Sequence, residues 1–241
     1  MLKGSFDNGP YWRKDILERV CPLFEQFGKL VLTRVLPAFD GINEEAHALE
    51  RRRDKELTSS VHAADEDDMW DAREAAANLA FNEAMDHAVL LESMRFATLN
   101  LYAVALYHLT EQHLIDLHLQ MLNSDRRHNL RPEHAKRWFK DTLGLALSSL
   151  PSWTVIEELK LVANVVKHGE GDSAALLRES RPDLFVYPSR RGHVESFDRP
   201  RIEVSLFGND FFVTKEKFEQ YHRGTVSFWT ELAHALSALP R

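Results

Sequence analysis

The chain has 241 residues, 44% hydrophobic and 28% charged, which is typical of a globular protein that buries a sizeable core. Its formal net charge of −7 excludes a general nucleic-acid binder with a basic surface throughout, so that such binding would need a local basic patch. Only 10 Gly and 9 Pro argue against a turn-rich all-β fold.

The compartment is predicted from the cysteine content and from the apolar segments. Cys21 is the only cysteine, which excludes a disulfide within the chain and fits a reducing compartment. The first residues lack the apolar core of a secretion signal, and the most apolar segment, FATLNLYAVALYHL, is too short to cross a bilayer. We therefore expect a cytoplasmic protein without membrane contact.

The first half of the chain is predicted to be helical. Apolar residues recur every three or four positions from Trp12 to Pro37, with an adjustment near Pro22, and a polar helix of mixed charge follows over residues 43–57. Small and acidic residues at 58–68 predict an exposed, mobile loop. Residues 69–122 contain no Pro or Gly, and their length predicts two long helices, or one kinked helix, changing direction near residues 92–98.

The second half predicts shorter elements. A loop and a helix cover residues 123–140, a helix runs from Ser152 to His168 with Gly169 past its end, and a short helix ends before Pro182. The segment RIEVSLFGNDFFVT reads as a small β-hairpin around its Gly-Asn-Asp turn, and Thr214 can cap the last helix. We predict one mostly α domain over residues 1–241, a helical bundle with long antiparallel helices and a small β-hairpin before the C-terminal helix.

The helix over residues 152–168 carries a narrow polar stripe on an otherwise apolar surface. At about 100° per residue, its apolar residues share one broad face, whereas Asn164 and His168, four positions apart, stand one above the other. The stripe also contains Glu157, Lys160 and Lys167. A structural explanation is available, because Lys and His in a last turn complement the helix dipole and Gly169 ends the helix.

The segment LKLVANVVKHGEG resembles the signature helix of the HEPN superfamily, in particular bacterial HEPN-like proteins. The family hallmark is Arg-Asn-x-x-x-His, in which Asn164 and His168 match the Asn and the His while Ala163 stands at the Arg position. The likeness extends to a long core helix, here with LYHLTEQHL, that precedes the signature helix.

The resemblance implies a HEPN-like fold and two alternative functions. One is a metal-independent ribonuclease, toxin-like, with a composite site across a homodimer in which His168 and Asn164 are catalytic. The other is a non-catalytic module that binds RNA or a nucleotide or assembles with a protein partner, in stress or phage defence. Alanine can neither carry charge nor fork onto a phosphate, so Ala163 favours the second alternative, although Lys160 and Lys167 could supply point charges to a phosphate.

Other clusters of polar residues are weaker candidates for a site. His108 and Glu111 share a face of the core helix, where they form either a hydrogen-bonded core pair or an extension of the Asn164–His168 stripe that contacts the substrate. The Glu-x-x-His spacings at 44/47 and 231/234 are too common by chance to predict a metal, and we expect neither metal nor cofactor. Cations between residues 126 and 140 form either a solvated face or a nucleic-acid contact. These cations are Arg126, Arg127, Arg131, Lys136, Arg137 and Lys140.

Overall fold

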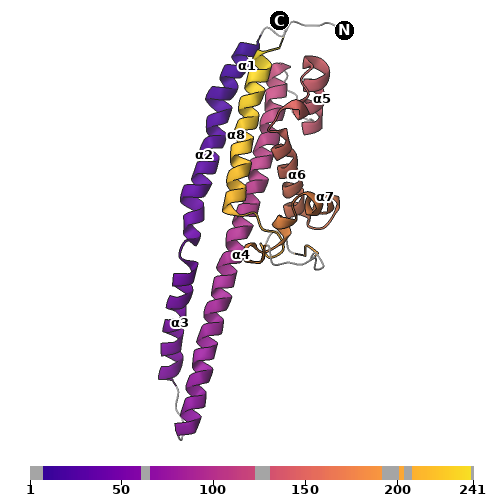
Figure 1. Cartoon of the computed structure of the whole chain (residues 1–241). Coiled ribbons are helices and arrows are strands. Elements are labelled where there is room, and N and C mark those ends of the chain that lie inside the picture. The colour runs from indigo at the N-terminus through magenta and orange to yellow at the C-terminus, as the bar shows by residue number, and fades with distance from the viewer. Residues whose placement is uncertain (1–7, 61–65, 123–130, 192–200, 204–207, 240–241) are drawn as a thin grey trace.

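The computed structural model describes residues 8–60, 66–122, 131–191, 201–203 and 208–239. All regular secondary structure in these ranges is helical, and the long helices pack side by side (Figure 1). The prediction of a mostly α helical bundle with long helices is therefore confirmed.

The N-terminal helical run contains two wide turns. It consists of α1 (Gly9–Asp15), a π-helical turn (Ile16–Val20), α2 (Cys21–Leu30), a second π-helical turn (Val31–Val35), a 3-10 turn (Leu36–Phe39) and α3 (Ile42–Ser59). The first π turn immediately precedes Pro22, where the predicted adjustment lies. Proline has no N–H to donate to the backbone hydrogen bonds of the helix. The hydrogen bonds therefore shift register before Pro22, and the Cys21 N–H donates to the Ile16 carbonyl oxygen in a π-helical turn.

Of the two alternatives predicted for residues 69–122, a pair of helices or one kinked helix, the pair is wrong. A single helix, α4 (Glu66–Met121), continues without interruption through residues 92–98 and has 56 residues, or roughly 84 Å at 1.5 Å per residue. Helices of this length need support along their sides, which α3 provides for the first half and the bundle for the second.

The predicted mobile loop at 58–68 is shorter than expected at both ends. Thr58 and Ser59 belong to α3, and α4 already begins at Glu66. The central part of that prediction, residues 61–65, lies outside the described residues.

The second half of the chain completes the bundle. Its helices are α5 (Pro132–Leu143), α6 (Trp153–His168), α7 (Asp172–Ser180) and α8 (Lys215–Ser237), with short 3-10 turns at Leu147–Ser149, Pro182–Phe185 and Pro188–Arg190. Gly169 ends α6 with a φ of 70°, and the Thr214 hydroxyl accepts the Lys217 N–H at the start of α8, so both predicted caps are confirmed.

The predicted β-hairpin before α8 is wrong for the residues that the structure describes. Residues 204–207 lie outside the described ranges, and no strand occurs among the described neighbours. Phe211, Phe212 and Val213 are buried and belong to no helix or strand. Their backbone pairs with other groups: Asn100 Nδ2 donates to Phe211 O at 2.9 Å, Val213 N donates to Asn100 Oδ1 at 3.1 Å, and Phe212 N donates to Leu184 O. A buried amide side chain of α4 thus takes the place of a second strand.

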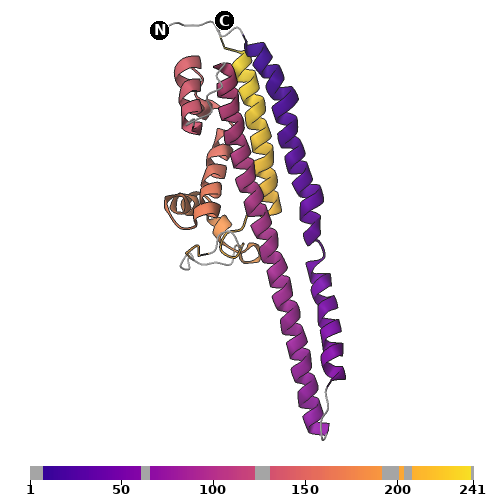
Figure 2. The same cartoon turned by 180° about the vertical axis from the view of Figure 1, so that it is seen from behind.

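The molecule divides into a body and an arm, which can be seen from both sides (Figures 1 and 2). The body contains α1, α2, the C-terminal half of α4 and α5 to α8, and both chain ends lie at its far end. The arm is α3 paired with residues 66–92 of α4 and extends beyond the rest of the bundle. By length and composition alone α4 is apolar enough to cross a membrane, a property that core helices of soluble bundles share, so the cytoplasmic location stays a prediction.

Candidate functional site

The two predicted faces of α6 are present in the structure. Leu159, Val162, Ala163 and Val166 are fully buried, packed in the body among α4, α7 and α8. Lys167 and His168 are exposed, and Lys160 and Asn164 are half-buried. The stripe is therefore an outer edge of the body, and its cations are open to solvent.

Asn164 has a structural partner. Its Nδ2 donates to Ser173 Oγ at 3.2 Å, and Ser173 lies in the first turn of α7. This bond ties α6 to α7 across the Gly169–Gly171 turn, while His168 projects from the exposed end of α6. Asn164 and His168 share a helix edge, but within the described part of the chain no hydrogen bond joins them.

Ala163, at the Arg position of the HEPN motif, is 0% exposed and belongs to the central core. Its side chain points away from the polar stripe and into the packing of α6 against the bundle. A guanidinium at this position would be buried without water, which is costly for a charged group. The position therefore contributes no phosphate-binding cation to the stripe.

Ion pairs connect the upper end of the stripe with α5. Lys160 Nζ lies 3.7 Å from Glu133 Oε1, and Lys136 Nζ lies 3.4 Å from Glu133 and 3.6 Å from Glu157. Lys136 also sits over the Trp153 ring, 4.9 Å from its centroid. Pairs this exposed contribute little stability and can exchange partners at little cost.

A hollow of about 420 Å³ continues this face beneath α5. Lys136, Arg137 and Lys140 line it together with Trp153, and Glu133 and Asp141 are the acidic members of its rim. Of the predicted basic patch, Arg131, Arg137 and Lys140 are exposed, and Arg126 and Arg127 lie outside the described residues. The cations of α5 and α6 thus share one face of the body.

His108 and Glu111 bond to each other as predicted, but with side chains 39% and 22% exposed they are not a core pair. His108 Nδ1 lies 2.9 Å from Glu111 Oε2. Burial, followed by Glu111 and the more distant Glu157 and Glu133, raises the pKa of Tyr107 above its ordinary value. The pair therefore lies near the Glu157 end of the stripe, and no described bond links it to Asn164 or His168.

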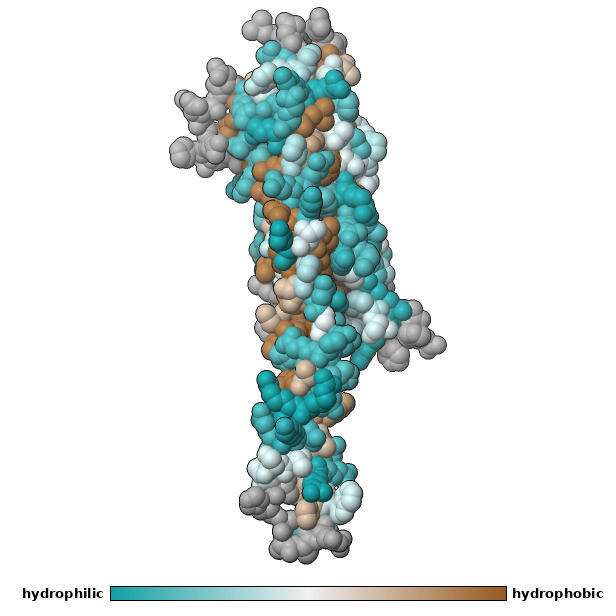
Figure 3. Space-filling view, turned by 90° about the vertical axis from the view of Figure 1, so that its left-hand side faces the viewer, coloured by the Kyte–Doolittle hydropathy of each residue, from teal (hydrophilic) through white to brown (hydrophobic). Residues whose placement is uncertain are grey.

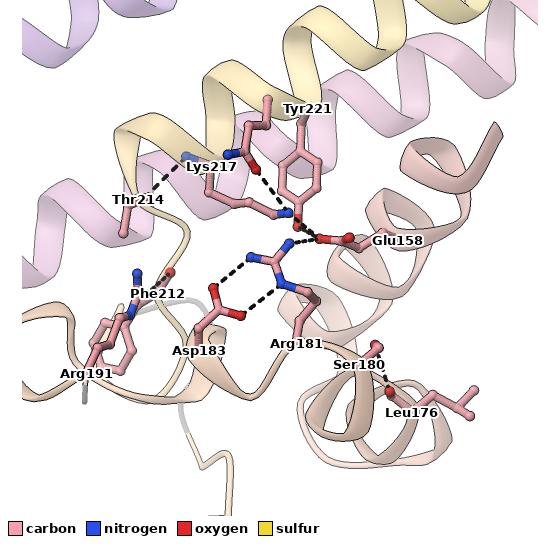
Figure 4. Close-up of polar contacts among 11 residues, drawn as sticks. Glu158, Leu176, Ser180, Arg181, Asp183, Arg191, Phe212, Thr214, Lys217 and Tyr221 are labelled. Atoms are coloured by element: carbon pink, nitrogen blue, oxygen red, sulfur yellow. Dashed lines mark hydrogen bonds and ion pairs between the residues drawn. The ribbon is translucent and has the colours of Figure 1, made fainter. Parts of the chain in front are cut away.

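A larger polar network, which the sequence did not reveal, joins α6, α7 and α8 (Figure 4). Glu158 Oε1 accepts from the Tyr221 hydroxyl at 2.8 Å and Arg181 Nη1 at 2.7 Å, and it lies 2.6 Å from Lys217 Nζ. Arg181 also forms a two-pronged pair with Asp183, at 2.9 and 2.7 Å. Glu158 is next to a stripe residue but points to the opposite edge of α6.

Burial and neighbouring charges shift the pKa values of residues in this network. Burial and Glu158 raise the pKa of Tyr221 well above its ordinary value, so the phenol stays protonated as a donor. Burial acts to raise the pKa of Asp183, but the hydrogen bonds from Arg181 overcome it and leave that pKa below its ordinary value. Each charge meets a partner, which is typical of a structural cross-link.

His118 is a buried histidine to which no described residue hydrogen-bonds. It is 4% exposed, its two ring nitrogens make no hydrogen bond in the structure as described, and it stacks on Trp138 of α5 with ring centroids 4.9 Å apart. Burial, and secondly the nearby His134, lowers the pKa of His118 below its ordinary value.

This environment predicts acid sensitivity. Unfolded His118 binds a proton more readily than folded His118, so the free energy of unfolding falls as the pH drops below about 6.5 and is unaffected by this group above it. His118→Phe keeps the ring stacking, and we expect it to flatten that dependence and to raise the free energy of unfolding by about 1 kcal/mol at neutral pH. His113, whose pKa burial also lowers, leaves a residual slope.

Urea unfolding between about pH 5 and pH 8 measures this effect. His234→Phe is the control, because His234 is exposed on α8. If His118→Phe and His234→Phe change the pH dependence of the free energy of unfolding equally, that dependence does not arise from His118.

The Glu-x-x-His pairs do not assemble a metal site among the described residues. The Glu231 carboxylate accepts from the backbone N–H of Ser152 at 3.0 Å and from its hydroxyl at 2.6 Å, and His47 pairs with Glu50. No group of three or more His, Cys, Asp or Glu side chains that could hold a metal ion occurs in the described ranges.

No protein-family model, curated protein or solved structure matches this chain. The resemblance to the HEPN superfamily therefore rests on residues 159–171 and their place in a helical bundle, and stays a prediction.

Proposed function

We propose that the chain is a non-catalytic, HEPN-like module that binds RNA or a nucleotide on the face formed by α5 and α6. The observation that carries the non-catalytic assignment is the complete burial of Ala163. Without a cation at that position, the imidazole of His168 lacks the group that would stabilise charge on a phosphate during cleavage. The Asn164 amide is also engaged, by Ser173.

The binding half of the proposal is supported by the cations of that face. Arg137, Lys140 and Lys167 are exposed, and no ion pair within the described ranges occupies them. Trp153 and the hollow beneath α5 add an aromatic wall beside these charges. Phosphates with attached rings suit such a combination of cations and aromatic surface.

Anisotropy of a labelled single-stranded RNA measures this binding. We expect Arg137→Glu and Lys167→Glu each to weaken binding about tenfold and to reduce the salt slope by about 0.7 for each phosphate that the variant no longer neutralises. Lys55→Glu, on the exposed side of α3, makes the same charge change away from this face and should leave affinity within about twofold. If all three variants weaken binding equally, the binding is a non-specific effect of charge and does not involve this face.

The ribonuclease remains the second candidate, because His168 and Lys167 are adjacent and exposed at the end of α6. RNA cleavage by the unmodified chain that His168→Ala abolishes would establish it and overturn the non-catalytic proposal. If a partner protein binds this face and RNA does not, the chain is an assembly module and the RNA-binding proposal is wrong.

A homodimer also stays a proposal, although its expected contact changes. A composite site with His168 and Asn164 would require pairing through α6, but the apolar surface of that helix is covered by α4, α7 and α8 of the same chain. The large exposed apolar side chains are concentrated instead on the arm.

A further inference from the structure

The arm exposes a line of large apolar side chains on α4, here called the arm seam. Trp70 is 71% exposed, and Phe81, Met85 and Val89 are 51%, 47% and 60% exposed. Together they leave on the order of 500 Å² of apolar surface in water, within the range of the largest patch on a typical monomer, a size that is often functional. The α3 side of the arm, by contrast, is mostly hydrophilic (Figure 3).

The arm seam continues the core face of the same helix. At about 100° per residue, its four residues project within the same sector, about 100° wide, as the buried residues one to several turns further along α4. Those buried residues are Phe96, Leu99, Ala103 and Leu106. In the body, α6 and α8 pack on α4, whereas in the arm only α3 accompanies it. The seam therefore has the pattern of a helix that is missing a neighbour.

A hollow of about 230 Å³ lies where the seam enters the body. Leu36, Phe96, Leu99 and Pro188 contribute to its apolar wall. Arg95, Lys215 and Thr214 are on its rim, as are the acidic Asp40 and Glu216. Arg95 to Leu99 are the next turns of α4 after Val89, so the hollow follows the seam along the helix, with the Glu92–Arg95 ion pair at 2.7 Å between them.

We propose that two copies of this chain pair antiparallel through their arm seams, with Trp70 of each copy in the hollow of the other. The spacing is self-complementary: Trp70 precedes Met85 by about 22 Å, and Leu99 follows Met85 by about 21 Å. A two-fold axis near Met85 therefore brings each tip to the level of the opposite hollow. Such pairing gives each arm the helical neighbour that it lacks in one chain.

Charge selects the antiparallel orientation, and the self-complementary spacing of the seam selects a second copy as the occupant. Residues 68–74 at the tip contain three acidic side chains and one arginine. Parallel pairing would place the two acidic tips together, whereas antiparallel pairing separates them and brings each to a rim of mixed charge, where Arg95 already pairs with Glu92 and Lys215 lies beside Glu216. The seam alone supplies on the order of 500 Å² of the roughly 800 Å² per partner of a standard interface.

Sedimentation velocity on the full chain at micromolar concentrations tests the pairing. We expect a dimer of the 27.8 kDa chain, and we expect Trp70→Glu and Phe81→Glu each to weaken the dimer at least tenfold. Leu101→Glu is the matched control, because Leu101 is 52% exposed on the opposite face of α4, and it should leave the dimer intact. A monomer up to about 100 µM, or a dimer that only Leu101→Glu disrupts, would overturn the proposal.

A cysteine placed at the expected axis tests the orientation. Met85→Cys should form a disulfide-linked dimer under mild oxidation, because antiparallel pairing brings the two copies of this position together. Leu101→Cys should stay monomeric by the same assay, and the native Cys21 is buried and does not compete. Cross-linking at position 101 and not at 85, or a partner other than a second copy retained on the arm, would show that the seam serves another contact.

Discussion

Glu158→Ala is expected to lower the free energy of unfolding by about 3 kcal/mol or more, as urea unfolding will measure. The carboxylate is the common acceptor for Arg181, Lys217 and Tyr221, and it joins α6 to α7 and α8. Lys217 is only 8% exposed, so removing Glu158 leaves a buried ammonium without its anion. The loss in the free energy of unfolding is larger than the stabilisation that the intact pair provides, because a desolvated charge is left without a counter-ion.

Glu157→Ala is the matched control. Glu157 is the preceding residue on α6, its side chain is 47% exposed, and it meets Lys136 at 3.6 Å. Removing this exposed pair should cost no more than about 1 kcal/mol. The double variant Glu158→Ala, Lys217→Met should recover part of the stability, since the unpaired cation is gone. Equal destabilisation by the two single variants would show that the network is not a buried cross-link.

Local patterns were sufficient to predict the shorter helices and their ends. The apolar spacing in α6 gave the buried and exposed faces, and Gly169 and Thr214 cap helices where expected. These features depend on residues within one or two turns of each other, which is why a sequence shows them. The Asn164 and His168 edge of α6 was found for the same reason.

Features that depend on residues far apart in the chain could not be predicted. Glu158 meets Tyr221 across 63 positions, and nothing local distinguishes its side chain from that of Glu157 beside it. The unbroken α4 was missed because an isolated chain segment gives no sign that α3 and the body will support it on successive stretches. The bond from Asn164 to Ser173 likewise required the turn between α6 and α7 to be known.

The incorrect β-hairpin has a specific physical cause. A run of β-branched and aromatic residues such as FFVT predicts a strand because such residues suit a half-buried extended chain. The segment is indeed buried, but Asn100, more than a hundred positions earlier, supplies the donor and acceptor that a neighbouring strand would have supplied. Local propensity indicated the burial, and a distant side chain decided the partner.

Asn100→Ala is therefore expected to lower the free energy of unfolding by roughly 3 kcal/mol, because it leaves the buried Phe211 carbonyl and Val213 N–H without these partners. Asn100 is 0% exposed, and neither backbone group can gain water without opening the segment. We also expect hydrogen exchange at the Val213 amide to accelerate by at least tenfold relative to the amides of α6. Thr110→Ala is the control on the same helix: Thr110 is equally buried, but its hydroxyl donates only to the Leu106 carbonyl within α4. If the two variants cost the same and Val213 stays protected, Asn100 is not what holds the segment of residues 211–213 to α4.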